Sequence, residues 1–127
     1  MTAHDPQMLK GVLSLLLLHL LAEEESYGHE IVKRLRAEGM PDLTEGTVYP
    51  AMARLEREGR VSARLIPSSS GPARKYYRPT AEGHAALEAG KRAWAAQAAI
   101  VATIFGRPLP ATGHGTASNE NNRRTHA

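Results

Sequence analysis

Cysteine is absent from the 127-residue sequence, which excludes disulfides, thiolate nucleophiles and cysteine-ligated zinc sites and suits a reducing cytoplasm. Aromatic residues make up only 5% of the sequence against 42% for all hydrophobic residues, so a packed core must be mostly aliphatic. The apolar stretch at residues 12–22 is interrupted by Ser14 and His19, is too short to span a bilayer and lacks a small-residue cleavage site. We therefore expect one small cytoplasmic domain that has no membrane partner.

The residue patterns that many enzymes and metal sites require are also missing. The His29-Glu30 pair is not followed by a second histidine four residues later, as it would be on a zinc-protease helix. There is no glycine-rich loop of the P-loop or dinucleotide-binding type, and the SSSG segment at residues 68–71 lacks the strand-to-helix elbow of a nucleophilic serine. We expect a protein that is not an enzyme and that needs no cofactor and no metal.

The net charge of +3 is small, but the basic residues are concentrated in one part of the chain. Residues 54–78 contain seven arginines and lysines and only two acidic residues. A basic sector on an otherwise nearly balanced chain is typical of a protein that binds a polyanion such as DNA. The alternative is an ordinary solvated surface, which sequence position alone does not reject.

Hydrophobic periodicity and capping signals predict four helices and one hairpin. Ser26, Thr44 and Thr80 are candidate N-caps for the second, third and fourth helices, and Gly39 is a natural stop for the second. Alternating apolar residues predict a strand at 60–66, and β-forming tyrosines predict a returning strand, with a long, mobile tip of turn formers between them. The predicted helices cover residues 7–22, 27–39, 44–59 and 81–105, the returning strand covers 73–78, and the tip covers 67–72.

This order of elements is that of a winged helix-turn-helix, in which the second and third helices form the helix-turn-helix pair and the hairpin forms the wing. The expected fold class is mainly α with a small β-hairpin. We expect a DNA-binding domain over residues 6–79, a long C-terminal dimerisation helix over 80–105 and a disordered tail over 106–127, which is rich in Gly, Pro, Asn and Thr and shows no periodicity.

The helix predicted at 44–59 begins with residues that suit contact with DNA. Gly46 leaves room for a DNA backbone, and Thr47 and Tyr49 carry hydroxyl groups for phosphates or bases. Pro50 removes one backbone hydrogen bond if the helix begins at Thr44, which we favour, and none if Thr47 is the effective cap. In the alternative interpretation Thr47 only caps the helix and Tyr49 packs under the wing. The candidate DNA-binding residues are Thr44, Gly46, Thr47, Tyr49, Arg54, Arg57, Arg74, Lys75 and Tyr77.

The last predicted helix has an apolar seam that argues for a homodimer. Its large residues recur at intervals of seven, seven and four, with small residues between them. The first three helices need one another for burial, so the seam has no partner left within the chain, and the first helix of a second subunit is the expected contact. A two-fold dimer would bind a palindromic DNA site. The candidate interface residues are Leu13, Leu16, Leu17, Leu87, Trp94, Val101 and Phe105.

Three segments, in this order and at this separation, resemble the PadR family of bacterial transcriptional regulators. They are YGHEIVKRL at 27–35, LTEGTVYPAMARLEREGRV at 43–61 and RKYYRPTAEGHAAL at 74–87. The resemblance implies a winged helix-turn-helix homodimer that represses promoters by binding an inverted repeat in double-stranded DNA. It also implies the small subgroup that has a single helix after the wing. Such a repressor would be associated with the nucleoid.

In multidrug-sensing members of that subgroup, a tryptophan on the last helix stacks on flat aromatic ligands at the dimer interface. Trp94 stands at the matching place, and Leu15 and His19 are the candidate neighbours of such a small aromatic effector. Trp94 could equally be an anchor that packs the dimer. The competing function is a winged-helix module for protein–protein interaction without DNA binding, and the retained basic residues of the third helix and the wing argue against it.

Overall fold

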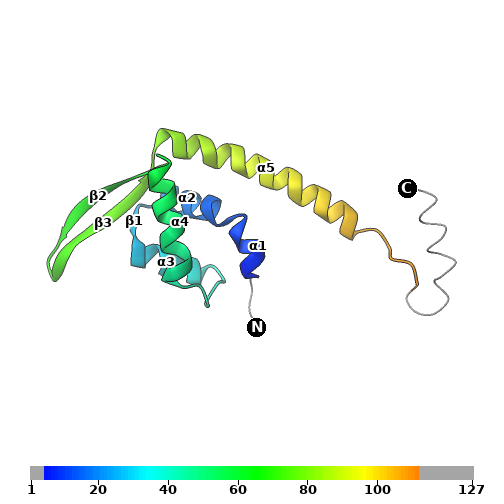
Figure 1. Cartoon of the computed structure of the whole chain (residues 1–127), viewed down its shortest axis with the longest axis horizontal. Helices are drawn as coiled ribbons and strands as arrows, with labels where there is room; N and C mark the ends of the chain where they lie inside the picture. Colours follow the sequence, from blue (N-terminus) through cyan, green and yellow to red (C-terminus); the bar gives the residue numbers. More distant parts are fainter. Residues whose placement is uncertain (1–4, 112–127) are drawn as a thin grey trace. The chain divides into compact units, whose positions relative to one another are not determined.

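The structure is a computed structural model that describes residues 5–111, and within them it contains five helices and three strands (Figure 1). Helices α3 (Gly28–Ala37) and α4 (Glu45–Arg57) form the helix-turn-helix pair, and strands β2 (Val61–Ser68) and β3 (Gly71–Pro79) form the wing, so the predicted winged helix-turn-helix is confirmed. The chain divides into two compact units after Trp94. The elements are α1 Pro6–Lys10, α2 Leu13–Glu23, β1 Ser26–Tyr27, α3 Gly28–Ala37, α4 Glu45–Arg57, β2 Val61–Ser68, β3 Gly71–Pro79 and α5 Ala81–Phe105.

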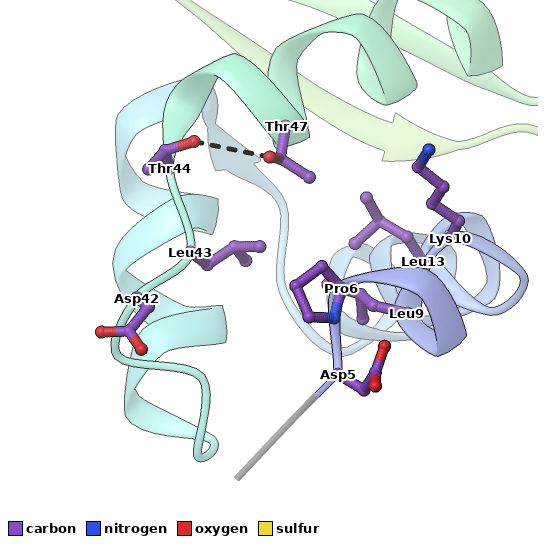
Figure 2. Close-up of a pocket in the computed structure, with 9 residues that line it drawn as sticks. All are labelled: Asp5, Pro6, Leu9, Lys10, Leu13, Asp42, Leu43, Thr44 and Thr47. Atoms are coloured by element: carbon purple, nitrogen blue, oxygen red, sulfur yellow. Dashed lines mark hydrogen bonds between the residues drawn. The ribbon is translucent and has the colours of Figure 1, made fainter. Parts of the chain in front are cut away.

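The prediction of one continuous helix over residues 7–22 is wrong, because the chain forms two helices that are separated at Gly11 and Val12. Short i to i+3 hydrogen bonds close the end of α1: the Gly11 N–H donates to the Met8 carbonyl at 3.3 Å, and the Val12 N–H donates to the Leu9 carbonyl at 3.0 Å. Glycine has a low helix propensity, which favours the break at this point. The short helix α1 therefore lies beside the loop that leads into α4 (Figure 2).

The core is aliphatic, as the composition predicts, and α2, α3 and α4 supply most of it. Leu18, Ile31 and Val48, one from each of these helices, have fully buried side chains. Leu13 and Leu17, two of the predicted dimer residues, belong to this core and are only 6% and 0% exposed. Side chains that are buried within one chain cannot contact a second subunit. Leu13 and Leu17 therefore have to be removed from the predicted dimer interface. The same holds for Leu87, which packs in the same core.

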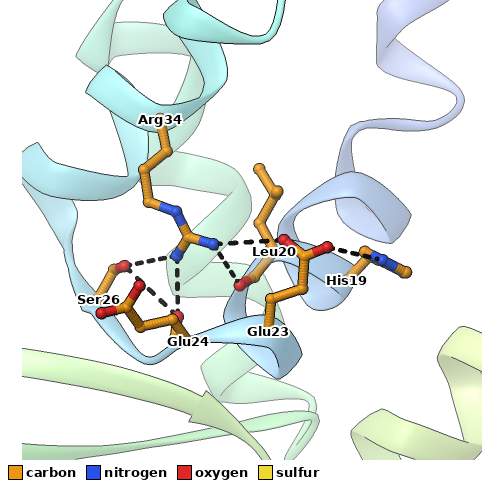
Figure 3. A network of polar contacts seen from close by, with 6 residues as sticks. All are labelled: His19, Leu20, Glu23, Glu24, Ser26 and Arg34. Carbon is orange, nitrogen blue, oxygen red and sulfur yellow. Dashed lines mark hydrogen bonds and ion pairs between the residues drawn. The ribbon is translucent and has the colours of Figure 1, made fainter.

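A third strand, β1, is the main element that the sequence patterns do not predict. It pairs with β3, which gives the antiparallel order β1-β3-β2. The prediction that Ser26 caps α3 is wrong, because Ser26 lies in β1 and Tyr27 holds the N-cap position. The buried Ser26 hydroxyl instead accepts a hydrogen bond from the Arg34 guanidinium at 2.7 Å. That guanidinium also donates to the Leu20 and Glu24 carbonyls, each at 2.8 Å, and so ties the end of α2 to β1 (Figure 3).

The wing is longer and more regular than predicted. Its strands continue past Pro67 and Pro72, so the long tip predicted at residues 67–72 is wrong, and only Ser69 and Ser70 lie between the strands. The register is irregular beside Pro67. Proline lacks an N–H and is tolerated at such bulges and on edge strands, and β2 is an edge strand of this sheet.

The junction from α4 to α5 depends on one threonine and two glycines. Gly59 follows α4 with a φ of 76°, a left-handed conformation that favours glycine. Thr80 caps α5, as predicted: its hydroxyl accepts from the Gly83 N–H at 3.0 Å and donates to the Gly59 carbonyl at 2.6 Å. A Cβ at Gly83 would overlap the Arg60 carbonyl oxygen. Glycine at this position therefore lets the first turn of α5 approach the end of α4.

Helix α5 covers the predicted residues 81–105 and exposes several large hydrophobic side chains near its end, among them Ile100, Ile104 and Phe105. No helix in the described part of the chain has the length and apolarity needed to cross a membrane. The tail predicted to be disordered covers residues 106–127, and its last sixteen residues, 112–127, lie outside the described residues.

Candidate nucleic-acid interface

The start of α4 exposes the polar residues that the sequence predicts to contact DNA. The helix begins directly after Thr44, whose side chain makes no capping bond to the backbone, while its Oγ1 lies 3.4 Å from Thr47 Oγ1 (Figure 2). Pro50 falls in the second turn of the helix, in agreement with the favoured interpretation. Gly46, Thr47 and Pro50 are exposed, and a Cβ at Gly46 would meet only the Thr44 side chain. The first turns of α4 thus present few bulky side chains at Gly46, Thr47 and Pro50, which suits close approach of a DNA backbone.

Tyr49 packs against α3 and is 44% exposed. A Cβ placed on Gly28 would lie 3.0 Å from Tyr49 Cε1, so the ring rests against the first turn of α3. Burial, together with the nearby Glu45 and Tyr77, raises the pKa of the Tyr49 hydroxyl, which therefore remains a neutral hydrogen-bond donor near neutral pH. The ring therefore packs against α3 and part of the side chain remains accessible, while its contact with DNA stays a prediction.

The second half of α4 carries two exposed arginines. Arg54 pairs with Glu58 one turn later, with 3.1 Å between Arg54 Nε and Glu58 Oε2. Arg57 has no ion-pair partner among residues 5–111. An exposed i,i+4 pair is weak, about 0.3–0.5 kcal/mol, so both guanidinium groups are available to phosphates.

The wing holds its cations against neighbouring elements. Lys75 Nζ lies 3.0 Å from Glu56 Oε1 of α4 and 5.5 Å from the centre of the Tyr77 ring. The hydrogen bond to Glu56 is the main reason that the pKa of Lys75 is raised, so this amine stays protonated. Arg74 lies over the Tyr27 ring, with its guanidinium carbon 4.6 Å from the ring centre, a cation–π contact.

A pocket of about 410 Å³ lies between the start of α3, the middle of α4 and strand β3. It brings together four of the predicted DNA-binding residues, Tyr49, Arg74, Lys75 and Tyr77. Thr44 and Thr47 line a different pocket, shared with α1, at the start of α4 (Figure 2). The sequence-based prediction missed Tyr27, His29 and Glu56, which also line the pocket between α4 and the wing. Each of these residues joins the pocket only through tertiary packing, so no local pattern could have indicated them.

A separate apolar cavity of about 370 Å³ lies where α2 meets α5. The predicted effector residues Leu15, His19 and Trp94 all line it, together with Leu16 from the predicted dimer interface. The Trp94 side chain is 56% exposed. His19 Nε2 lies 3.3 Å from Glu23 Oε2 one turn later (Figure 3). The residues that line the cavity are Val12, Leu15, Leu16, His19, Leu87, Lys91 and Trp94.

The described residues contain no group of three or more histidines, aspartates or glutamates placed to hold a metal ion. Helix α4 and the wing present hydroxyl, backbone and cationic groups. Such groups supply the phosphate contacts that dominate DNA affinity and the hydrogen bonds that read base edges.

Comparison with known proteins identifies similar chains across most of this sequence. A sequence profile of the "Transcriptional regulator PadR-like family" matches residues 17–89, more than half of the chain. A transcriptional regulator of Mycobacterium tuberculosis is 34% identical over 86 residues, which cover 66% of this chain and 77% of that protein.

Two solved structures show the same similarity in three dimensions. A PadR-like transcriptional regulator from Bacillus cereus superposes with a TM-score of 0.72 at 36% identity, covering 80% of this chain and 99% of the other. A PadR family regulator from Eggerthella lenta superposes with a TM-score of 0.74 at 32% identity, covering 80% of this chain and 88% of the other.

Proposed function

This chain belongs to the PadR-like family of transcriptional regulators, and from that membership we propose that it acts as a homodimeric repressor that binds a palindromic operator. PadR-like regulators are DNA-binding proteins and not enzymes. The proposal adds the repressor activity, the dimer, the symmetry of the operator and a location at the nucleoid in the cytoplasm.

One observation carries the DNA-binding part of the proposal. The start of α4 exposes polar residues, and α4 and the wing, which follow each other along the chain, also carry cations. Gly46 and Thr47 suit close approach to the DNA backbone and contact with base edges. Arg57, Arg74 and Lys75 suit contacts with phosphates. Together they provide one sequence-reading element and several sequence-independent contacts.

Exposed apolar residues of α5 support the dimer. Trp94, Val101 and Phe105 are 56%, 39% and 82% exposed in the single chain, and Leu16 of α2 is only partly buried. A surface of this kind is costly to leave in water and usually marks a partner surface. A two-fold dimer would present two α4 helices to successive major grooves, about 34 Å apart, which requires a palindromic site.

Electrophoretic mobility shift with DNA from upstream of the protein's own gene tests the operator. The wild type should shift this duplex at concentrations that leave a random duplex free. Thr47→Ala should weaken binding and relax the preference between the two duplexes, whereas Arg57→Gln should weaken binding to both alike. Equal binding of the wild type to both duplexes would contradict the proposal of a sequence-specific repressor and would favour a module that binds other proteins.

A second proposed function is release from DNA by a flat aromatic effector in the cavity beside Trp94. The cavity is apolar and contains the indole, with His19 and Lys91 as its titratable groups. Titration of planar aromatic compounds should quench Trp94 fluorescence and weaken the DNA complex at matching concentrations. Compounds that neither quench the indole nor release DNA would count against an effector, and Trp94 would then be a dimer-packing residue while the operator proposal stands.

A further inference from the structure

Glu56 is an acid in a surface where DNA binding would favour only cations. It lines the pocket between α4 and the wing, and it is the one acidic side chain among the residues that line this pocket. A carboxylate near bound phosphates lowers DNA affinity by repulsion. Its position beside Lys75 therefore calls for a role other than raising affinity.

The contact of Glu56 with Lys75 joins the recognition helix to the wing. Lys75 Nζ donates to Glu56 Oε1 at 3.0 Å, and the two side chains are 49% and 36% exposed. The ring of Tyr77 lies on the same ammonium group, with its centre 5.5 Å from Nζ. Lysine is a flexible cation with four rotatable side-chain bonds, and these two contacts fix where its charge lies.

A held ammonium group can still bind a phosphate. It carries three protons, and Glu56 accepts one of them. The half-exposed side chain can donate another proton to a phosphate, but only at the position that Glu56 permits. A free lysine at the same place would follow a DNA backbone of any shape.

We propose that Glu56 determines the specificity of DNA recognition by holding Lys75 against α4. The paired charges largely cancel at a distance, which weakens attraction to DNA of arbitrary sequence. The Lys75 contact then forms where the backbone of the correct site fits the wing. This inference rests on the proposed contact of α4 and the wing with DNA.

Other cations of α4 and the wing also have acidic partners, since Arg54 pairs with Glu58 and Arg64 pairs with Glu25, but Lys75 is the cation that Glu56 of α4 holds. Arg57, also on α4, has no acidic partner in the described part of the chain, and Arg74 of the wing contacts an aromatic ring. Neither contact cancels the charge of the arginine. Glu56 therefore acts on one cation, Lys75 of the wing, and joins it to α4.

A double-mutant cycle on two duplexes tests this role. The variants are Glu56→Gln, Lys75→Met and the double variant, and the probes are DNA upstream of the protein's own gene and a random duplex of equal length. Glu56→Gln should raise affinity for the random duplex about two- to fivefold, the range of an exposed ion pair. The slope of log affinity against log salt should steepen by about 0.9, because one more phosphate is neutralised. In the Lys75→Met background only the repulsion between Glu56 and phosphate remains, so Glu56→Gln should raise affinity by much less and leave the slope nearly unchanged.

A gain of the same size without Lys75 would overturn the proposal, because Glu56 would then act only through net charge. Glu38→Gln provides the charge-matched control, since Glu38 is exposed and has no ion-pair partner within residues 5–111. A gain in affinity from Glu38→Gln as large as that from Glu56→Gln would also overturn the proposal. The random duplex answers the question about Glu56 even if the upstream DNA contains no operator. Absence of wild-type preference for the upstream DNA would count against the proposed operator and not against this contact.

An NMR titration provides a second test that needs no DNA. The pKa of Lys75 in the wild type should lie above the ordinary lysine value of 10.5 and should fall in Glu56→Gln. A Lys75 pKa that is unaffected by the substitution would show that the contact does not form in solution, and it would overturn the proposal.

Discussion

Replacing Arg34 with methionine should destabilise the protein strongly, although the residue lies outside every proposed binding surface. Arg34 is 23% exposed and makes three charge-assisted hydrogen bonds of 2.7–2.8 Å, to the Leu20 and Glu24 carbonyls and to the Ser26 hydroxyl (Figure 3). Methionine keeps most of the apolar stem and removes all three donors. The two carbonyls and the buried hydroxyl would then each lose a charged donor, and they would keep only the Glu24 N–H bond to the Leu20 carbonyl at 3.1 Å and the Ser26 hydroxyl bond to the Glu24 carbonyl at 3.5 Å.

The expected loss follows from these contacts. A hydrogen bond to a charged group contributes about 1.5–3 kcal/mol when its partner is left without a substitute. Water replaces part of this at the open side of Arg34, so we expect a loss of about 3 kcal/mol in total. For a domain of this size, each kcal/mol lowers Tm by about 4 °C, which gives a fall of about 12 °C.

Urea and thermal unfolding, followed by circular dichroism, measure the loss directly. All variants need the same protein concentration, because an oligomer gains apparent stability with concentration. Lys33→Met is the matched control: Lys33 is the exposed neighbour of Arg34 on α3 and has no ion-pair partner in the described residues, so its loss should change stability by less than about 0.5 kcal/mol. A change below about 1 kcal/mol for Arg34→Met would refute the reasoning that this guanidinium joins α2 to β1.

Three further outcomes follow from the same structure. Gly83→Ala should cost about 2 kcal/mol in a urea titration, because a Cβ there overlaps the Arg60 carbonyl oxygen, while Gly71→Ala, which has open space around it, should be nearly neutral. The pKa of Glu45 is lowered, mainly by backbone hydrogen bonding and then by His29. A lowered carboxyl pKa stabilises the fold above the ordinary value of 4.5 and loses this effect as the pH falls through the folded value, so Glu45→Gln should flatten the decline in Tm between about pH 5 and pH 3. Arg57→Gln should reduce the salt slope of DNA binding by about 0.9, as measured by fluorescence anisotropy at several salt concentrations; an unchanged slope would place Arg57 outside the contact.

The elements that were predicted correctly depend on local chemistry. Thr80 caps α5 through its own hydroxyl, and the left-handed glycines Gly39 and Gly59 follow α3 and α4. Helix α4 begins directly after Thr44 even though Pro50 lies inside it, because its buried face of Val48 and nearby apolar residues outweighs one missing backbone bond. Each of these features can be recognised from a few adjacent residues.

The elements that were missed depend on partners far away in the sequence. Strand β1 has only two residues and forms because β3 offers it an edge. The ends of the wing strands contain Pro67 and Pro72, which suggest a loop, yet pairing between the strands continues past them. The hydrogen bond from Lys75 to Glu56 joins residues that are nineteen positions apart in the sequence. No helix or strand periodicity predicts a contact between residues at this separation. The sequence therefore predicted which cations are candidates for DNA contact, and the structure was needed to show which of these side chains contact other side chains of the chain.

For the proposed palindromic operator, the junction between α4 and α5 has a consequence for the spacing of the half-sites. Thr80 donates hydrogen bonds to the Gly59 and Arg60 carbonyls. Gly83 lets the first turn of α5 pack directly against the Arg60 carbonyl, so the junction is tightly packed. One base pair inserted between half-sites would turn one half-site by about 35° relative to the other. A flexible hinge between α4 and α5 would allow the two α4 helices to reorient by this angle, whereas the two Thr80 hydrogen bonds oppose such a rotation. We therefore expect the protein to tolerate altered bases in the spacer far better than an altered spacer length.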